Sequence, residues 1–409
     1  MQKNKASLLA GLLLSTAAPA VLADEAPGIH ADFETSLGSF TCVLYYEDSP
    51  RAVANFIGLA EGSRPWIDPA TGAIRREPFY DGLTFHRVIE GFMNQSGSRN
   101  AQGNDGPGYS FRDELDNGLL HDAPGILSMA NSGPHTNGSQ FFVTVEPTPW
   151  LDGGHTVFGS VVEGIEVVEA INEVPTDAND RPIDPVIIHS ITIRRTGPDA
   201  EAFDIHAQGL PICRPVPGKL SATAMGQPIE YQMNAPQPPG SEFIVFESDD
   251  LASWARLGTL WQQDNGAGFE DIGLGNMSEI RKFYHFNLVE YSDSMGFSTT
   301  ANLTIDISWQ DAQEVLNEVT FQLDASGEAG SAEWRHEETE ATTIIEAWVD
   351  SASAYQTTWI IRTEDHGYWR IQASFNSRSP NEVEGTAGVF RFAGGWQPQG
   401  SGPITVAFP

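Results

Sequence analysis

Four short blocks of sequence, each rich in glycine, amide and aromatic residues, constrain the fold of this chain more than any other feature. They read FHRVIEGFMNQ, ILSMAN, TNGSQFF and WLDGGHTVFG, in that order, between Phe85 and Gly159. Runs inside them, such as Phe85–Ile89 and Phe141–Val145, contain the aromatic and β-branched residues that favour short strands. Four blocks in a fixed order are much more specific than one short motif, which occurs in many unrelated chains by chance.

These blocks resemble, in order and spacing, the landmarks of the cyclophilin family of peptidyl-prolyl cis–trans isomerases. The resemblance covers Asp32 to Arg195, which is less than half of the chain. It implies a closed eight-stranded antiparallel β-barrel with two helices. It also implies catalysed rotation about the peptide bond that precedes proline. The remaining residues have to be interpreted without it.

The hydrophobic pattern of the same region also predicts a mainly β fold. Phe33–Ser36 and Ser39–Tyr46 flank a Leu-Gly turn, as the two strands of a hairpin do. A helix is predicted between Pro50 and Gly62, because proline is common in the first turn of a helix and glycine is common at its C-terminal end. A second helix is predicted over Ile165–Ile171. Many strands with two helices fit a closed antiparallel barrel whose ends the helices cover.

The rest of the chain is predicted to be β-rich as well. Short alternating strands separated by Gly, Asn and Asp turns recur between Ile229 and Phe392. This pattern is typical of β-sandwich or barrel-like modules, and we expect one or two of them. The predicted organisation is a signal peptide over 1–23, an isomerase domain over 24–196, a linker over 197–217, a small β module over 218–291 and a second β-rich module over 292–409.

The N-terminus has the layout of a secretory signal peptide. Lys3 and Lys5 precede an apolar run, and small residues around Ala23 offer a cleavage position before acidic residues. The alternative is a membrane anchor, but the run is short and Pro19 interrupts it. We therefore expect export, to the periplasm or to the medium, with cleavage near Ala23. No later apolar run reaches the length that spans a bilayer, so no membrane insertion is expected.

The balance of charges and the two cysteines restrict partners and compartment further. The chain has 55 acidic and only 22 basic residues, a charge that repels nucleic acid and anionic membrane surfaces. High solubility is the plainer explanation of this charge, and mimicry of an acidic ligand is the alternative. Cys42 and Cys213 could pair in an oxidising compartment, but buried free thiols are the expectation.

The chemistry that the resemblance implies is simple. Rotation about an X-Pro amide breaks C–N resonance, with a barrier of roughly 18–20 kcal/mol. The twisted amide has a pyramidal nitrogen with a lone pair. A catalyst therefore needs an apolar slot for the proline ring and a fixed donor aimed at that nitrogen. Arginine suits the second task because its guanidinium stays charged and planar.

The resemblance assigns these tasks to particular residues. Arg87 is the donor, Gln95 is expected to hold it, and Asn131 is expected to bind the peptide backbone. Trp150 and His155 close the rim, where the family's cyclosporin contacts lie. The catalytic residues predicted in this way are Arg87, Gln95, Phe92 and His155. The predicted substrate-binding residues are Met93, Ala130, Asn131, Gln140, Phe142, Trp150 and Leu151.

Some of these residues have plainer explanations when each is taken alone. Phe92 and Phe142 would fit a hydrophobic core as well as a binding slot. Arg87 is harder to explain without a function, because an arginine among apolar residues is costly unless it is paired. Ser96 and His135 depart from the usual family residues and bear on substrate preference.

The leading hypothesis is an exported isomerase that acts on X-Pro bonds of secreted or periplasmic proteins during folding. Its expected partners are proline-containing peptides, unfolded client proteins and cyclosporin. No cofactor or metal is expected, because the reaction needs neither and no phosphate loop, HExxH helix or CxxC pair occurs. The alternative is an exported proline-peptide-binding, adhesion or carbohydrate-binding protein with little turnover. Arg87 favours the enzyme, whereas exposed aromatic residues gathered on the C-terminal half would favour the alternative.

Overall fold

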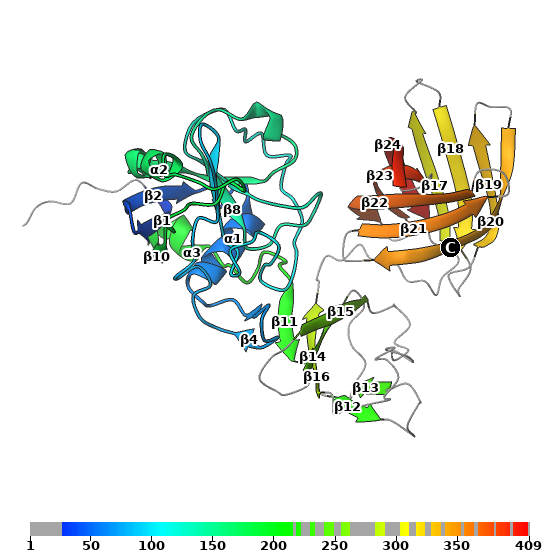
Figure 1. The fold of residues 1–409 in the computed structure, drawn as a ribbon, viewed down its shortest axis with the longest axis horizontal. Coiled ribbons are helices and arrows are strands. Elements are labelled where there is room, and N and C mark those ends of the chain that lie inside the picture. The colour runs from blue at the N-terminus through cyan, green and yellow to red at the C-terminus, as the bar shows by residue number, and fades with distance from the viewer. Residues whose placement is uncertain are drawn as a thin grey trace, which may run out of the picture.

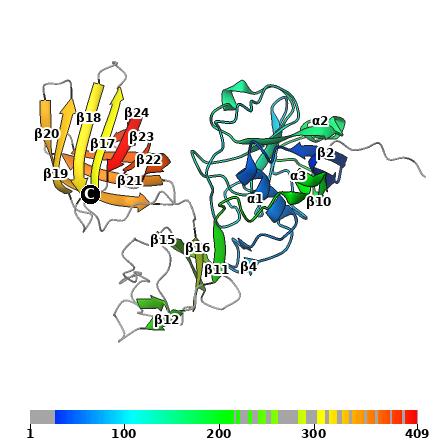
Figure 2. The ribbon, with the colours of Figure 1, turned by 180° about the vertical axis from the view of Figure 1, so that it is seen from behind.

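A computed structural model gives the fold of the chain. The structure describes residues 27–215 without a gap and, after them, the strands between 218 and 407. The predicted signal peptide over 1–23 lies outside the described residues. Figure 1 shows the N-terminal sheet with its helices and a C-terminal barrel as separate bodies. The view from behind shows the same separation (Figure 2).

The first body is an eight-stranded antiparallel sheet with strand order β10-β1-β2-β9-β7-β8-β6-β5. The hairpin predicted at its start is present, with Phe33 opposite Phe40. In chain order the strands are β1 (Gly28–Thr35), β2 (Gly38–Leu44), β5 (Arg87–Ile89), β6 (Met93–Ser96), β7 (Ile126–Met129), β8 (Phe141–Thr144), β9 (Val157–Glu163) and β10 (Ile188–Thr196). Between β2 and β5, the short strands β3 (Trp66–Ile67) and β4 (Ile74–Arg75) form a separate hairpin.

The prediction of a closed barrel has to be corrected for this sheet, which is open. Its edge strands β5 and β10 form no ladder, and one isolated bridge between Thr84 and Ile187 lies between them. Two backbone hydrogen bonds flank that bridge, from Phe85 to the Val186 carbonyl at 3.0 Å and from Ile188 to the Leu83 carbonyl at 2.7 Å. Prolines at 182 and 185 interrupt the segment that enters β10. Because proline has no N–H to donate, a continuous ladder cannot start there.

The sheet carries three helices rather than the two predicted. They are α1 (Pro50–Ala60), α2 (Ile165–Asn172) and α3 (Pro198–Ala202), and a 3₁₀ turn, η1, covers Pro149–Leu151. The third helix lies in the segment predicted to be a linker. It is short, and only Ala200 in it is buried.

Helix α1 begins at the predicted proline, but its first turn is stabilised from outside the helix. Ser49 does not cap it, because the Ser49 hydroxyl donates to the Val157 carbonyl at 2.6 Å. Instead the Glu114 carboxylate accepts the backbone N–H groups of Arg51 and Ala52, at 3.1 and 3.0 Å. A negative charge at a helix N-terminus satisfies these unpaired donors and opposes the helix dipole.

An aromatic core joins α1 to the sheet. Phe33 and Phe40 stack with ring centroids 4.4 Å apart. Phe56 of α1 meets Phe141 of β8 edge-on at 5.7 Å, and both side chains are fully buried. Such pairs add to the free energy gained from burial alone. The core therefore fixes β8, the strand from which part of the site is built.

The later part of the chain is β-rich, as predicted. A four-stranded sheet has the order β11-β16-β14-β15, and β12 pairs with β13. Their bounds are β11 (Ile212–Pro215), β12 (Gly218–Ser221), β13 (Glu230–Met233), β14 (Ser241–Ser248), β15 (Ala255–Trp261) and β16 (Phe283–Glu290). We call the four-stranded one the second sheet.

The eight strands that follow form the one closed barrel among the described residues. They are β17 (Leu303–Gln310), β18 (Leu316–Leu323), β19 (Ala329–His336), β20 (Glu340–Ala352), β21 (Gln356–Thr363), β22 (Gly367–Ser379), β23 (Glu382–Phe392) and β24 (Trp396–Ala407). Each strand pairs with the next, and β24 closes the barrel on β17. Apolar side chains such as Ile305, Phe375 and Val406 are fully buried in it.

Candidate active site

One row of residues across neighbouring strands carries the central part of the site. Arg87 of β5 lies opposite Gln95 of β6, Gln95 lies opposite Phe142 of β8, and Phe142 lies opposite Ser128 of β7. Residues directly opposite one another in antiparallel strands project from the same face of the sheet. The strand register therefore brings the predicted donor, the predicted glutamine and one predicted slot residue onto one face.

Arg87 lies at the exposed edge of this row. Its guanidinium Nε is 3.6 Å from Asp180 Oδ2, and both side chains are 45% exposed. Asp180 was not predicted to belong to the site. Its carbonyl also accepts the N–H of Val88 at 2.7 Å, so the 177–183 loop is attached beside β5. An exposed pair of this kind orients the guanidinium with little effect on stability.

Two aromatic pairs form the slot next to the row. Phe92 lies 5.8 Å from Trp150, and Phe142 meets His155 edge-on at 5.5 Å. Trp150 is 69% exposed, whereas Phe142 is buried, so the slot has an open rim and a closed floor. Met93 is also buried, two residues before Gln95 on β6.

The rim is held by hydrogen bonds of its short turn. Leu151 ends η1, and its carbonyl accepts the N–H groups of Gly154 and His155 at 3.1 and 3.2 Å. A ring nitrogen of His155 lies 2.9 Å from the Met129 carbonyl. This contact ties the rim to β7.

A chain of amides occupies the other side of the row. The Gln95 side-chain amide donates to Gln140 Oε1 at 3.0 Å, and Gln140 in turn donates to the carbonyls of Gly103 and Asp105 at 3.0 and 2.9 Å. The Ala130 N–H donates to the Gln140 carbonyl at 3.0 Å. The Gln95 side-chain amide donates to Gln140. That Gln95 also positions Arg87 stays a prediction.

The side chain of Asn131 forms hydrogen bonds with the backbone of the loops around it. Its amide donates to the Gly154 carbonyl at 2.8 Å, and its oxygen accepts the Gly133 N–H at 3.2 Å. Binding of a peptide by the Asn131 main chain stays a prediction. Ser96 and His135, the two departures from the family pattern, are both buried and hydrogen-bonded, to the Thr84 carbonyl and to Asp113.

A triad next to Phe142, with His121 and Ser128 buried and Asp152 partly exposed, was not predicted. His121 lies 2.8 Å from Asp152 Oδ1 and 2.9 Å from Ser128 Oγ, and its ring stacks on Phe142 with centroids 5.8 Å apart. Ser128 and Asp152 lie inside two of the sequence blocks. His121 lies outside them, and no local pattern marks it. The triad therefore becomes visible only when the fold brings the three residues together.

This triad has the residue types of a hydrolase site but not its accessibility. Ser128 is fully buried, and its hydroxyl donates to the Thr156 carbonyl at 3.1 Å. Burial lowers the pKa of His121, although Asp152 acts in the opposite direction. Desolvation would raise the pKa of Asp152, but hydrogen bonds from His121 hold it below its usual value. A neutral imidazole bound at both nitrogens supports the Phe142 ring from below.

A guanidinium beside an aromatic slot suits the twisted amide. The slot accepts an apolar ring, and the donor strengthens its interaction only when the amide nitrogen gains a lone pair. Among the residues that the structure describes, no group of three His, Cys, Asp or Glu side chains could hold a metal ion.

Comparisons with known proteins identify this arrangement. The family described as cyclophilin-type peptidyl-prolyl cis-trans isomerase/CLD matches residues 30–193. Peptidyl-prolyl cis-trans isomerase A of Mycobacterium tuberculosis is 50% identical over 165 residues, which are 40% of this chain and 91% of that protein. Peptidyl-prolyl cis-trans isomerase B of Streptomyces anulatus is 46% identical over 168 residues, 40% of this chain and 96% of that protein.

A solved structure is similar as well. It is a Cryptosporidium parvum cyclophilin-type isomerase crystallised with the dipeptide Ala-Pro, 32% identical, with a TM-score of 0.36, over 41% of this chain and 99% of that one. Since half of the aligned residues are identical across nearly the whole of the mycobacterial isomerase, this chain belongs to the cyclophilin family of peptidyl-prolyl cis–trans isomerases.

Proposed function

We propose that this isomerase is exported and accelerates the folding of secreted or periplasmic proteins by rotating their X-Pro bonds. The observation that carries the proposal is the signal-peptide pattern ahead of an intact site, with Lys3, Lys5 and the apolar run before Ala23. Proline isomerisation takes tens of seconds or more without catalysis, long enough to limit folding after export. No helix among the described residues has the length and apolar character of a membrane span.

The mechanism follows from the row and the slot. The proline ring of a client enters between Phe92 and Phe142, and Arg87 faces the amide nitrogen. As the bond twists, the nitrogen lone pair becomes an acceptor for the guanidinium. This interaction is stronger in the twisted state than in either planar isomer, which is the condition for catalysis. Extended and unfolded segments are the substrates, because the open rim at Trp150 admits a peptide chain rather than a folded surface.

The export half of the proposal is tested by the N-terminus of the mature protein. Expressed with its own leader in a Gram-negative host, the protein should appear in the periplasm or medium and begin at Asp24. Fractionation followed by N-terminal sequencing measures both. A protein that stays in the cytoplasm and retains residues 1–23 would contradict export and leave the isomerase activity untouched.

Cyclosporin binding is proposed on the same surface. Trp150 is exposed at the rim and lies 5.8 Å from Phe92, where a large apolar ligand could cover both rings. Trp150→Ala should therefore raise the inhibition constant of cyclosporin about tenfold, since a lost aromatic contact of about 1.4 kcal/mol corresponds to that factor. Competition in a peptide isomerisation assay measures it. Val162→Ala, which shortens another exposed apolar side chain, is the control.

A further inference from the structure

A cavity lies beside the row of residues that carries the site. It has a volume of about 670 Å³, and Gln95, Ala130, Asn131 and Gln140 of the predicted site line one side of it. Arg87 and the aromatic slot residues are not among the lining side chains, so the cavity is a neighbour of the slot. Gln95 belongs to the row and also lines the cavity, so the two are contiguous.

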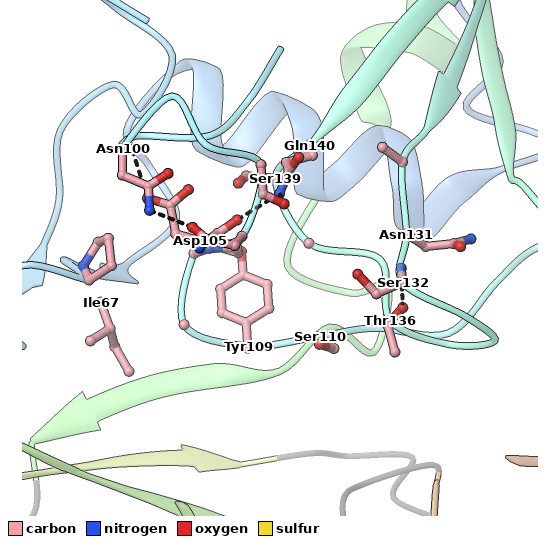
Figure 3. Close-up of a pocket in the computed structure, with 18 of the residues that line it drawn as sticks. Ile67, Asn100, Asp105, Tyr109, Ser110, Asn131, Ser132, Thr136, Ser139 and Gln140 are labelled. Carbon is pink, nitrogen blue, oxygen red and sulfur yellow. Dashed lines mark hydrogen bonds between the residues drawn. The ribbon is translucent and has the colours of Figure 1, made fainter. Parts of the chain in front are cut away.

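The far wall of this cavity comes from outside the isomerase family's own region. Ile244 and Phe246 of β14 and Arg256 of β15 line it, and they meet Ile67 of β3, which belongs to the isomerase domain. These residues of the second sheet lie beyond residue 193, where the family match ends. Figure 3 shows Asn131 and Ser132 on one side of the cavity and Ile67 on the other.

The strand register explains why these side chains share one face. On β14, Ile244 lies opposite Asn287 of β16, and Phe246 lies opposite Arg256 of β15. Because Ile244 and Phe246 are two residues apart, all four side chains project from the same face of the second sheet. That face is the one turned toward the isomerase domain.

The same face is docked on the β3–β4 hairpin. Asn287 is fully buried, and its amide donates to the Gly72 carbonyl at 2.6 Å. A Cβ at Gly72 would lie 2.7 Å from the Phe246 ring, and Gly72 has a φ of +70°. Only glycine allows so close an approach in that backbone conformation. The docking therefore places Arg256, the partner of Phe246, at the cavity.

A second tie holds the other end of the sheet. Arg64 is buried, and its guanidinium donates to the Tyr109 hydroxyl at 2.9 Å and to the Pro211 carbonyl, directly before β11. Since β11 pairs with β16, and β16 with β14, this contact positions the cavity wall as well.

The charges around the cavity favour an acidic ligand side chain. Asp105 is its lining carboxylate, and Asp105 already accepts the Ser98 hydroxyl at 2.6 Å and the N–H groups of Arg99 and Asn100 at 3.0 and 2.8 Å. Arg256 contributes a guanidinium to the lining, together with the buried side chains of Ile244 and Phe246. An apolar stem with a carboxylate end, as in glutamate, matches this combination.

We propose that the second sheet completes a peptide subsite beside the proline slot, in which Arg256 selects substrates that carry an acidic residue flanking the X-Pro bond. The proposal rests on the isomerase activity of the Arg87 site. It gives the C-terminal extension a direct role in substrate choice.

The test compares matched peptides on the full mature protein. One series has glutamate, and the other glutamine, at each position in turn on both sides of a single proline, and exchange spectroscopy measures kcat/KM for each. At one or two positions the glutamate peptide should be preferred about threefold, the size expected of a partly exposed ion pair. Molar salt should abolish the preference.

Two variants assign this preference to the cavity wall. Arg256→Gln should remove it, whereas Arg214→Gln should keep it. Arg214 is the matched control because it lies on β11 of the same sheet and does not line the cavity. Equal rates for the two peptide series in the parent protein, or an unchanged preference in Arg256→Gln, would overturn the subsite. If the parent protein turned over neither peptide series, the proposed isomerase activity would be contradicted instead.

Discussion

Arg87→Ala should lower kcat/KM for a proline-containing peptide about a hundredfold, the usual loss for one oriented electrostatic donor. The free energy of unfolding should change by less than about 1 kcal/mol, because the Arg87–Asp180 pair is an exposed one. Line-shape or exchange NMR on a short peptide measures the rate, and urea unfolding measures the stability. A large loss of kcat/KM with little change in the free energy of unfolding indicates an interaction made in the twisted state.

Two further variants sharpen this test. Arg87→Lys keeps the charge but not the planar fork, and should recover only part of the activity. Asp180→Asn removes the partner of Arg87 and should leave most of the activity, since an exposed ion pair orients the guanidinium only weakly. Native turnover in Arg87→Ala would refute the mechanism, and another donor in the row would then have to be sought.

Acid should weaken the isomerase domain through His86. The ring of this residue is 6% exposed, and neither of its nitrogens has a hydrogen-bond partner among the described residues. Burial lowers the pKa of His86 from 6.5 to about 4, and Asp105 offsets this only in part. The folded pKa lies below the unfolded one, so the unfolded chain takes up the proton first. Stability is complete above about pH 6.5 and is lost as the pH falls toward 4.

The size of this loss follows from the difference between the two pKa values. At 1.36 kcal/mol per pKa unit, protonation of His86 corresponds to about 3 kcal/mol at the acid end of the window. Hydrogen-exchange mass spectrometry of the full chain, followed on peptides within 30–193, measures the opening free energy across this range. His86→Leu should flatten that part of the profile. His189→Leu, an exposed histidine on β10, should leave it unchanged.

The sequence marked candidate site residues but could not show how they meet. The blocks contained Arg87, Gln95 and Phe142, and the family resemblance gave them roles. Their alignment in one row depends on the register of three strands, which pairing across the sheet decides. Asp180 and His121 had no local signal, because each becomes important through a partner distant in the chain.

The fold was predictable to a similar degree. Alternating apolar residues revealed the strands in both halves of the chain, since that pattern is local. Whether a sheet closes into a barrel depends on all of its strands together. The prediction placed the closed barrel in the N-terminal domain, whereas the structure has it in the C-terminal part. The N-terminal sheet is left open where prolines at 182 and 185 stand, whereas strands β17 to β24 close. Local alternation is the same in a sandwich and in a barrel, so it could not separate the two for the C-terminal half.

The contact between Arg64 and Pro211 has a consequence for where the catalytic unit ends. A guanidinium in the interior needs its acceptors, and removing one of them leaves a desolvated charge that is expensive to keep. A chain shortened after Gln208 would lose the Pro211 carbonyl, which is one of the two acceptors of the Arg64 guanidinium, and would leave that charge with Tyr109 alone. The isomerase domain therefore needs the chain up to β11, because that segment supplies an acceptor for Arg64. The boundary between the catalytic domain and the rest of the chain has to lie after that strand.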